Sequence, residues 1–148
     1  MTDRHRYEDA TLSALRIAAG LGYFSHGAQK LFGWFGGIDG DGGTAALMTR
    51  FGAAGVIEVV CGTAIVLGLF TRPLAFLASG QMAVAYFWVH AAGSDELFWW
   101  ANGGELPMVY AFLWLYIAVR GPGSFSMDAW LERRRAEPAG GAAGETVR

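Results

Sequence analysis

The sequence predicts an all-α, polytopic membrane protein: a bundle of four transmembrane helices with both termini in the cytoplasm. Four long apolar runs divide the chain. Hydrophobic residues make up 53% of it and charged residues only 16%, which is more apolar than a soluble domain of this size. A soluble four-helix bundle is disfavoured, because its helices would show a polar stripe at every turn and these runs do not.

The apolar runs have the length of membrane spans. They cover Thr11–Phe32, Gly52–Phe70, Pro73–His90 and Glu105–Arg120. A helix of about 20 residues, rising ~1.5 Å per residue, crosses a hydrocarbon core of ~30 Å. Small residues recur at four-residue spacing, as at Ala75, Ser79 and Ala83, and would let neighbouring helices approach closely in lipid.

The distribution of positive charge predicts the orientation. Segments that share one side of a four-span chain carry Arg4, Arg6, Arg72, Arg120, Arg133, Arg134 and Arg135. The other side holds Arg50, Lys30 near the end of the first run, and four acidic residues: Asp39, Asp41, Asp95 and Glu96. The positive-inside rule therefore places both termini in the cytoplasm. The first run is too long for the core of a cleavable signal peptide.

The runs divide the chain into four parts. Residues 1–10 form a short charged cytoplasmic lead, and residues 11–120 form the four-helix transmembrane domain. Within 121–135, after a Gly-Pro-Gly stop, a short amphipathic helix is expected on the inner membrane surface. Residues 136–148 are rich in Ala, Gly and Pro and are expected to be disordered.

The loops on the predicted outer side contain turn and capping residues. Asp39 and Asp41 lie in a glycine-rich stretch that lacks the other ligands of a calcium loop, so we interpret it as a turn. Thr44 is expected to cap a helix that leads into the second run. Asn102 and Glu105 resemble a capping box at the start of the fourth run.

The first run carries a polar stripe. Arg16, Tyr23 and Lys30 are spaced by seven residues, and His26 lies on the same face. An ionised group that faced lipid would cost on the order of 2.5–3.5 kcal/mol, so we expect this face to point into the bundle. Arg16 is expected to extend its side chain to the cytoplasmic headgroups.

Glu58 lies at the same predicted depth as His26. Each is six residues from the outer end of its run, or ~9 Å below the boundary. Lys30 can reach the same level, so Glu58 is expected to pair with Lys30 or with His26.

The remaining candidates come from the third and fourth runs. His90 and Tyr86 share a stripe on the third run, whereas Gln81 falls on the opposite face and is left out. The candidate catalytic residues are His26, Lys30 and Glu58. The candidate substrate-binding residues are Tyr23, Tyr86, His90, Asn102 and Glu105. Each also has a structural interpretation, as an ion pair, an interfacial side chain or a helix cap.

Several classes of site are disfavoured. The sequence has no Glu-x-x-His or His-x-x-x-His pair for a metal and no Gly-x-Gly-x-x-Gly turn for a dinucleotide. Nothing is basic enough for a nucleic acid partner. The single cysteine, Cys61, is expected to be a packing residue.

The same polar residues carry a resemblance to a known family. The stretches are Leu15-Arg16-Ile17, Phe24-Ser25-His26-Gly27-Ala28-Gln29-Lys30-Leu31-Phe32-Gly33, Glu58 with Gly62, Gly68-Leu69-Phe70-Thr71-Arg72, Asn102-Gly103-Gly104-Glu105, and Gly121-Pro122-Gly123 with Ser126 and Asp128. Over residues 11–130 the chain resembles DoxX-family membrane proteins. The resemblance implies a four-helix membrane bundle, in agreement with the apolar runs.

The resemblance also implies a class of function. The family takes its name from a subunit linked to a thiosulfate:quinone oxidoreductase, and some bacterial relatives are associated with oxidative-stress complexes and quinone-related detoxification. We therefore expect a multi-pass protein of the bacterial cytoplasmic (inner) membrane that is a redox-associated subunit, at most one subunit of a quinone-linked oxidoreductase. Its outer-leaflet polar pocket is expected to take a quinone or a small sulfur anion. Its expected partners are membrane lipid, a protein of a redox complex and, in a homo-oligomer, further copies of itself.

Two alternatives stay open. Distant eukaryotic relatives resemble cargo receptors or chaperones, so the chain is alternatively a non-enzymatic membrane scaffold or assembly factor. Transport of a small solute is less favoured, because four spans are few and no helix is broken in mid-membrane.

Overall fold

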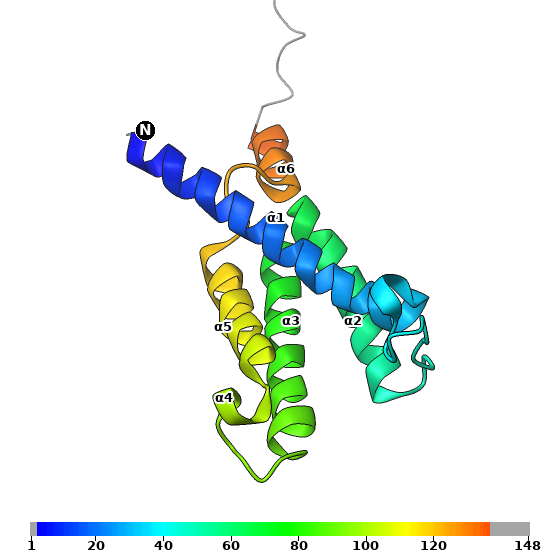
Figure 1. Cartoon of the computed structure of the whole chain (residues 1–148). Helices are drawn as coiled ribbons and strands as arrows, with labels where there is room; N and C mark the ends of the chain where they lie inside the picture. The colour runs from blue at the N-terminus through cyan, green and yellow to red at the C-terminus, as the bar shows by residue number, and fades with distance from the viewer. Residues whose placement is uncertain (1–2, 137–148) are drawn as a thin grey trace, which may run out of the picture.

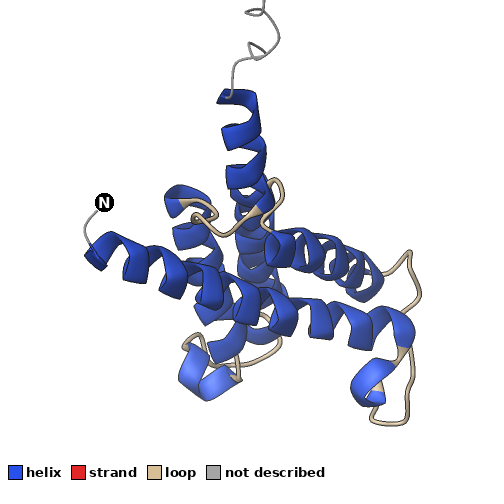
Figure 2. Cartoon of the chain, turned by 90° about the horizontal axis from the view of Figure 1, so that it is seen from above, coloured by secondary structure: helices blue, strands red, loops and turns tan. Residues whose placement is uncertain are grey.

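Residues 3–136 are described by the computed structural model, and they are mostly helical (Figures 1 and 2). The elements are α1 Asp3–Phe32, the 3₁₀ turn η1 Trp34–Gly36, α2 Arg50–Leu67, α3 Thr71–Ala85, the π-helical segment η2 Tyr86–Ala91, α4 Trp99–Asn102, α5 Glu105–Arg120 and α6 Met127–Ala136. The predicted all-α class is confirmed for these residues. The expected disordered tail lies outside them, apart from Ala136, which ends α6.

Four long helices share one buried core. It contains Tyr23 from α1, Cys61 and Ile65 from α2, Ala75, Ala78 and Met82 from α3, and Trp114 and Ile117 from α5. In Figure 1, α5 lies beside α3, and α1 crosses in front of the hairpin of α2 and α3. One end of the molecule, here called the terminal end, contains the start of α1, the turn between α2 and α3, and α6. At the opposite loop end are the 33–49 and 92–104 connections.

Glycines bring α1 and α2 into backbone contact. A Cβ atom on Gly27 would lie 2.7 Å from the Val59 nitrogen, and one on Gly62 would lie 2.8 Å from the Phe24 nitrogen. The contact glycines, Gly20 and Gly27 on α1 and Gly55 and Gly62 on α2, have the same seven-residue spacing. Any larger residue would push the helices apart, so this seam fixes α1 over α2.

Arg16 is buried, and the expectation that it extends to the headgroups is wrong. It is 1% exposed. It donates hydrogen bonds to the carbonyls of Ile65 and Val66 (2.7 Å) at the end of α2, and to those of Pro122 (3.0 Å) and Phe125 (2.7 Å) beyond α5. Because the last carbonyls of a helix have no partner within it, a guanidinium there satisfies them and complements the helix dipole.

Two further side chains close helix ends at the terminal end. Arg72 donates to the carbonyls of Ala118 (3.2 Å) and Val119 (2.5 Å) near the end of α5. Asp128 of α6 accepts hydrogen bonds of 2.9 Å from the amides of Phe70 and Thr71, where α3 begins. The helices are therefore locked at this end by a cation on each of two C-termini and an anion on one N-terminus.

The loop-end caps differ from those expected. α2 is capped by Thr49, whose hydroxyl accepts from the Gly52 amide at 3.1 Å, and not by Thr44. Asn102 ends α4 and does not begin α5 as the cap of a capping box; α5 follows Gly104. The predicted turn at Asp39 is confirmed. Its carboxylate accepts from the amides of Gly43 (2.8 Å) and Asp41 (3.0 Å), and these bonds hold its pKa below the ordinary value.

The outer surface of the long helices is apolar, unlike that of a typical soluble protein. Large apolar side chains of α2, α3 and α5, among them Val60, Phe76 and Phe112, are exposed, whereas Arg16 and Glu58 are buried. This arrangement suits a hydrocarbon environment. Two helical stretches, Arg50–Leu67 and Thr71–Ala91, are long and apolar enough to cross a membrane, with mean hydropathies of 1.7 and 1.2.

Candidate functional site

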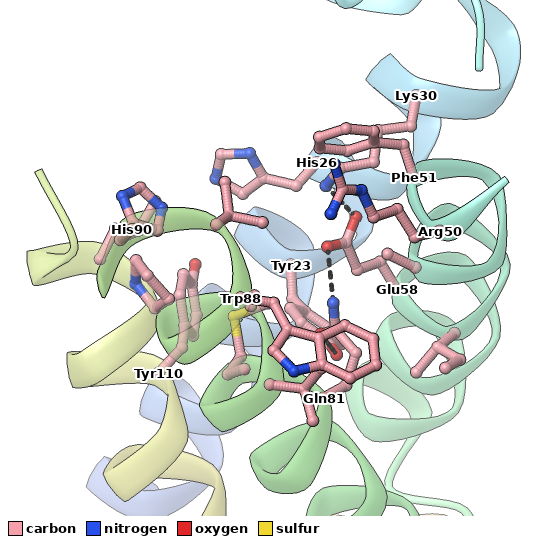
Figure 3. Close-up of a pocket in the computed structure, with 18 of the residues that line it drawn as sticks. Tyr23, His26, Lys30, Arg50, Phe51, Glu58, Gln81, Trp88, His90 and Tyr110 are labelled. Carbon is pink, nitrogen blue, oxygen red and sulfur yellow. Dashed lines mark hydrogen bonds and ion pairs between the residues drawn. The ribbon is translucent and has the colours of Figure 1, made fainter. Parts of the chain in front are cut away.

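The loop end contains a cavity of about 510 Å³, here called the loop-end cavity (Figure 3). Its walls come from α1, the first half of α2, the second half of α3 with η2, and the start of α5. Most of the lining is apolar, including Ile57, Met82, Val84, Trp88 and Leu106. The polar lining consists of Tyr23, His26, Lys30, Arg50, Glu58, Gln81, His90 and Tyr110. A cavity of this size, apolar with a few polar groups, is typical of a small-molecule site.

Glu58 and Lys30 form the central ion pair of the cavity. Lys30 Nζ lies 2.5 Å from Glu58 Oε2, and the side chains are 21% and 1% exposed respectively. Glu58 emerges from α2 beside the glycine seam, where Gly27 leaves no side chain between it and α1. The carboxylate is therefore held against the one flexible cation on α1 that can reach it. The expected Glu58–Lys30 pairing is the one that the structure contains.

Gln81 extends this pair into a chain, and its assignment to the opposite face is wrong. Its amide nitrogen lies 3.4 Å from Glu58 Oε1, and its amide oxygen accepts a 2.7 Å hydrogen bond from the Tyr23 hydroxyl. The ring of Tyr23 packs in turn against Trp114 and Tyr110, at centroid distances of 5.4 and 5.9 Å. Lys30, Glu58, Gln81 and Tyr23 thus form one hydrogen-bonded chain across α1, α2 and α3.

The π-helical segment explains why a regular helical projection places Gln81 on the face opposite His90. Nine residues separate Gln81 from His90, which places them about 180° apart on an α-helix with ~100° per residue. In η2 the Ala92 amide bonds to the Phe87 carbonyl five residues earlier, at 3.0 Å. A π-turn holds one residue more than an α-turn, and this shifts the phase by roughly 100°. Both side chains consequently line the same cavity.

The two histidines face the cavity without touching the ion pair. Figure 3 shows His26 on α1 and His90 on η2 lying apart from Glu58. Among the described residues, no hydrogen bond or ion pair joins His26 to Glu58. His90 Nδ1 lies 3.2 Å from the backbone carbonyl of Asn102. The rings therefore have nitrogen atoms free to contact a ligand, and Asn102 positions one of them.

Three predicted substrate-binding residues are not part of the cavity lining. Tyr86 is buried, and its hydroxyl donates to the Leu97 carbonyl. Asn102 donates through its amide to the carbonyls of Glu96 (3.0 Å) and Leu97 (3.3 Å) and so closes the 92–98 loop. Glu105 is exposed at the start of α5. Tyr86 and Asn102 thus shape the wall that carries His90.

Among the lining residues that were not candidates, four carry polar or indole side chains: Arg50, Gln81, Trp88 and Tyr110. Gln81 could have been found as an uncharged polar residue within an apolar run. Arg50 was assigned only to the outer side, because the helix start at residue 50 was not predicted. Trp88 and Tyr110 lie among many aromatic residues, and no sequence signal separates them.

No cluster of three or more His, Cys, Asp or Glu side chains that could hold a metal ion occurs within residues 3–136. The two histidines and Glu58 contribute to the same cavity, but they do not converge on one point. The arrangement can instead present hydrogen-bond donors to a bound molecule, with a carboxylate that neutralises one of them.

The exposed apolar helices, the buried ionisable side chains and the cavity together define a helical membrane protein with a ligand-sized site. The chain belongs to the DoxX family, whose model matches residues 11–91. It is 39% identical over 129 residues to an uncharacterized protein of Haemophilus influenzae, covering 86% of this chain and 96% of the relative. It is 32% identical over 123 residues to the inner membrane protein YphA of Escherichia coli, covering 76% and 84% respectively. No solved structure matches.

Proposed function

We propose that this DoxX-family protein binds a quinone headgroup in the loop-end cavity and serves as a redox-associated subunit of the bacterial inner membrane. α1, α2, α3 with η2, and α5 each cross the bilayer, the terminal end faces the cytoplasm, and the cavity lies in the outer leaflet. The exposed apolar side chains on these helices and the name of the Escherichia coli relative support insertion in the inner membrane. The arginines gathered at the terminal end support the orientation, because positive charge favours the cytoplasmic side.

The observation that carries the proposal is the Lys30–Glu58 pair on the wall of a mostly apolar cavity. A buried ion pair is expensive to desolvate and is weak evidence of a stabilising role. In a membrane interior, ionisable groups usually mark a functional site. The cavity, of about 510 Å³, would accommodate an aromatic or quinoid ring, whereas a small sulfur anion would leave most of the apolar wall without contacts.

The side chains have distinct roles in this proposal. Lys30 and His26 donate hydrogen bonds to a quinone oxygen, and His90 approaches the opposite side of the ring. Reduction of a quinone to a quinol takes up two electrons and two protons; a partner protein supplies the electrons. Glu58 and the histidines exchange the protons, and Gln81 keeps the carboxylate of Glu58 oriented.

The test compares quinone binding by variants that keep the fold. The double variant Lys30→Met, Glu58→Gln removes both charges together, so neither is left unpaired. Purified protein in lipid nanodiscs is titrated with decylubiquinone, and binding is followed by quenching of tryptophan fluorescence. We expect affinity to fall by tenfold or more, which corresponds to about 1.4 kcal/mol per tenfold change.

The matched control is Glu132→Gln on exposed α6, which should bind as the unaltered protein does. Thermal unfolding of all variants in the same nanodiscs verifies that the fold is kept. Unchanged affinity in the folded double variant would contradict the proposed role of the pair.

The scaffold or assembly-factor alternative has one supporting observation. The 33–49 connection at the loop end exposes large apolar residues, including Phe35, Leu47 and Met48, the last at 99%. Such residues suit a docked protein as well as the bilayer interface. If the chain is a scaffold, the purified protein binds no quinone, and a stoichiometric partner stays attached in the Lys30→Met, Glu58→Gln variant.

A further inference from the structure

The loop-end cavity lies in a wedge between two helices that separate toward the loop end. α2 and α3 are joined by the short turn 68–70, and in Figure 1 they diverge away from it. The cavity lining takes residues 50–58 from the start of α2 and residues 81–90 from the far half of α3 and η2. Both stretches belong to the wide part of the wedge.

α1 covers one face of the wedge between α2 and α3 and leaves the opposite face uncovered. From α1, the buried Tyr23 and the partly buried His26 and Lys30 form the back wall of the cavity. At the opposite face, the lining residues Phe51 and Ala53 of α2 and Val84 and Trp88 of α3 and η2 are exposed, Trp88 at 65%. The cavity therefore has a side opening flanked by these four residues, on a surface that the proposed placement turns toward lipid.

Polarity changes from the back of the cavity to this opening. Glu58 is 1% exposed, and each of its oxygens already has one hydrogen-bond partner, Lys30 for one and Gln81 for the other. The lining contains two cationic side chains, Lys30 and Arg50, and one carboxylate, Glu58. Its formal net charge is therefore +1 when both histidines are neutral. The groups available to a ligand are therefore mainly hydrogen-bond donors, and the walls between them and the opening are apolar.

We propose that the cavity is loaded sideways from the bilayer, through the opening between α2 and η2, by a membrane-dissolved amphiphile. Its head carries hydrogen-bond-accepting oxygens and lies against Lys30 and Arg50, and its apolar tail passes between Phe51 and Trp88 into the lipid. The inference rests on the proposed function and narrows its ligand to molecules with a tail. A water-soluble anion has no apolar part to place in such an opening.

The experiment narrows the opening without altering the back wall. Ala53→Trp and Val84→Trp each place an indole at the opening, and Val60→Trp and Val109→Trp are matched controls on exposed positions outside the cavity lining. Each protein, in nanodiscs, is titrated with decylubiquinone and with its tail-free analogue ubiquinone-0. Binding is measured by competition with a radiolabelled quinone, so the added tryptophans do not disturb the signal.

We expect both opening variants to weaken decylubiquinone by about tenfold, equivalent to one step of 1.4 kcal/mol, and to leave ubiquinone-0 nearly unchanged. The controls should bind both quinones as the unaltered protein does. Unchanged binding of decylubiquinone in the two opening variants would overturn the side entrance while leaving the proposed function standing. An equal loss for both quinones would also overturn it, because the head site would then be affected and not the tail path.

Failure of the unaltered protein to bind either quinone would overturn the proposed function together with this inference. A second copy of the chain over the same face is a separate outcome. Val84→Cys in a Cys61→Ala background, oxidised in native membranes, would then form a disulfide-linked dimer. Such a dimer at full yield would show the opening to be an interface between copies and would overturn lateral loading.

Discussion

Glu58 and Arg16 are both ionisable and both 1% exposed, yet their surroundings differ. Arg16 uses its whole guanidinium on backbone carbonyls of two chain segments. Glu58 contacts two side chains at the wall of a cavity. The first arrangement saturates the charged group and joins helices, whereas the second leaves space beside it. This contrast assigns Arg16 to the fold and makes Glu58 the better candidate for chemistry.

The substitution Arg16→Lys should destabilise the protein although it keeps the charge. A lysine ammonium cannot match the planar fork that reaches Ile65, Pro122 and Phe125 together, so buried carbonyls lose their donors. An unsatisfied buried acceptor costs about 1–3 kcal/mol, and we expect a loss of at least ~2 kcal/mol in the free energy of unfolding. Reversible unfolding in mixed detergent micelles measures it.

Arg133→Lys, on the exposed part of α6, is the control and should leave stability unchanged. Equal stability of Arg16→Lys and the unaltered protein would show that the four carbonyl contacts do not hold the terminal end together.

At the scale of the element, the close contact of α1 with α2 can be tested with two Gly→Ala substitutions, one within the contact and one outside it, which should affect stability differently. Gly27→Ala places a Cβ 2.7 Å from the Val59 nitrogen and 2.8 Å from the Gly55 carbonyl oxygen. Backbone atoms cannot move aside as a flexible side chain can, so we expect destabilisation of about 1–3 kcal/mol. The Lys30–Glu58 distance should also increase.

Gly80→Ala is the matched case on α3, because a Cβ there meets nothing within 4 Å. Alanine is the better helix former by up to about 1 kcal/mol, so this variant should be neutral or more stable. Unfolding of both variants under one condition gives the comparison. A Gly27→Ala protein as stable as Gly80→Ala would mean that the seam is looser than the structure shows.

The four long helices could be predicted from the sequence because each contains a long apolar run, although α1 begins at Asp3, before its run. The sequence narrowed the partner of Glu58 to Lys30 or His26, since these side chains reach a similar depth, and the structure contains the pair with Lys30. Gln81 could not be placed correctly, because a helical projection assumes a constant phase and η2 changes it. No residue of Tyr86–Ala91 signals this π-turn by itself.

The terminal-end contacts show a second limit of prediction. Arg16, Arg72 and Asp128 all appear in the stretches that carry the family resemblance, but their spacing does not reveal which helix ends they contact. Contacts between residues more than 50 positions apart, such as Asp128 with Thr71, depend on the assembled helices. The side opening of the cavity was equally out of reach, because it depends on the angle between α2 and α3.

At the scale of the whole molecule, the proposed orientation can be tested by labelling single cysteines. Cys61 is buried and is first replaced by alanine. Met48→Cys in the 33–49 connection should react with a membrane-impermeant maleimide in intact spheroplasts, because positive-inside topology places it outside. Glu132→Cys on α6 should react only after the membrane is permeabilised.

The reverse pattern would place the cavity in the inner leaflet and invert the predicted orientation. Labelling of both positions in intact spheroplasts would contradict the three spans, α2, α3 with η2, and α5, that the proposal places between Met48 and α6.

The lock at the terminal end has a consequence for genetics. Substitutions at Arg16 and Asp128 should abolish the function of the protein in cells because the destabilised chain is degraded by quality-control proteases. Substitutions at Glu58 should also abolish function, but in a protein that still accumulates in the membrane. A selection that scores growth alone would rank both groups together and suggest two active centres at opposite ends. Immunoblots of membrane fractions, read beside the growth scores, would separate residues needed for survival of the polypeptide from those needed for its task.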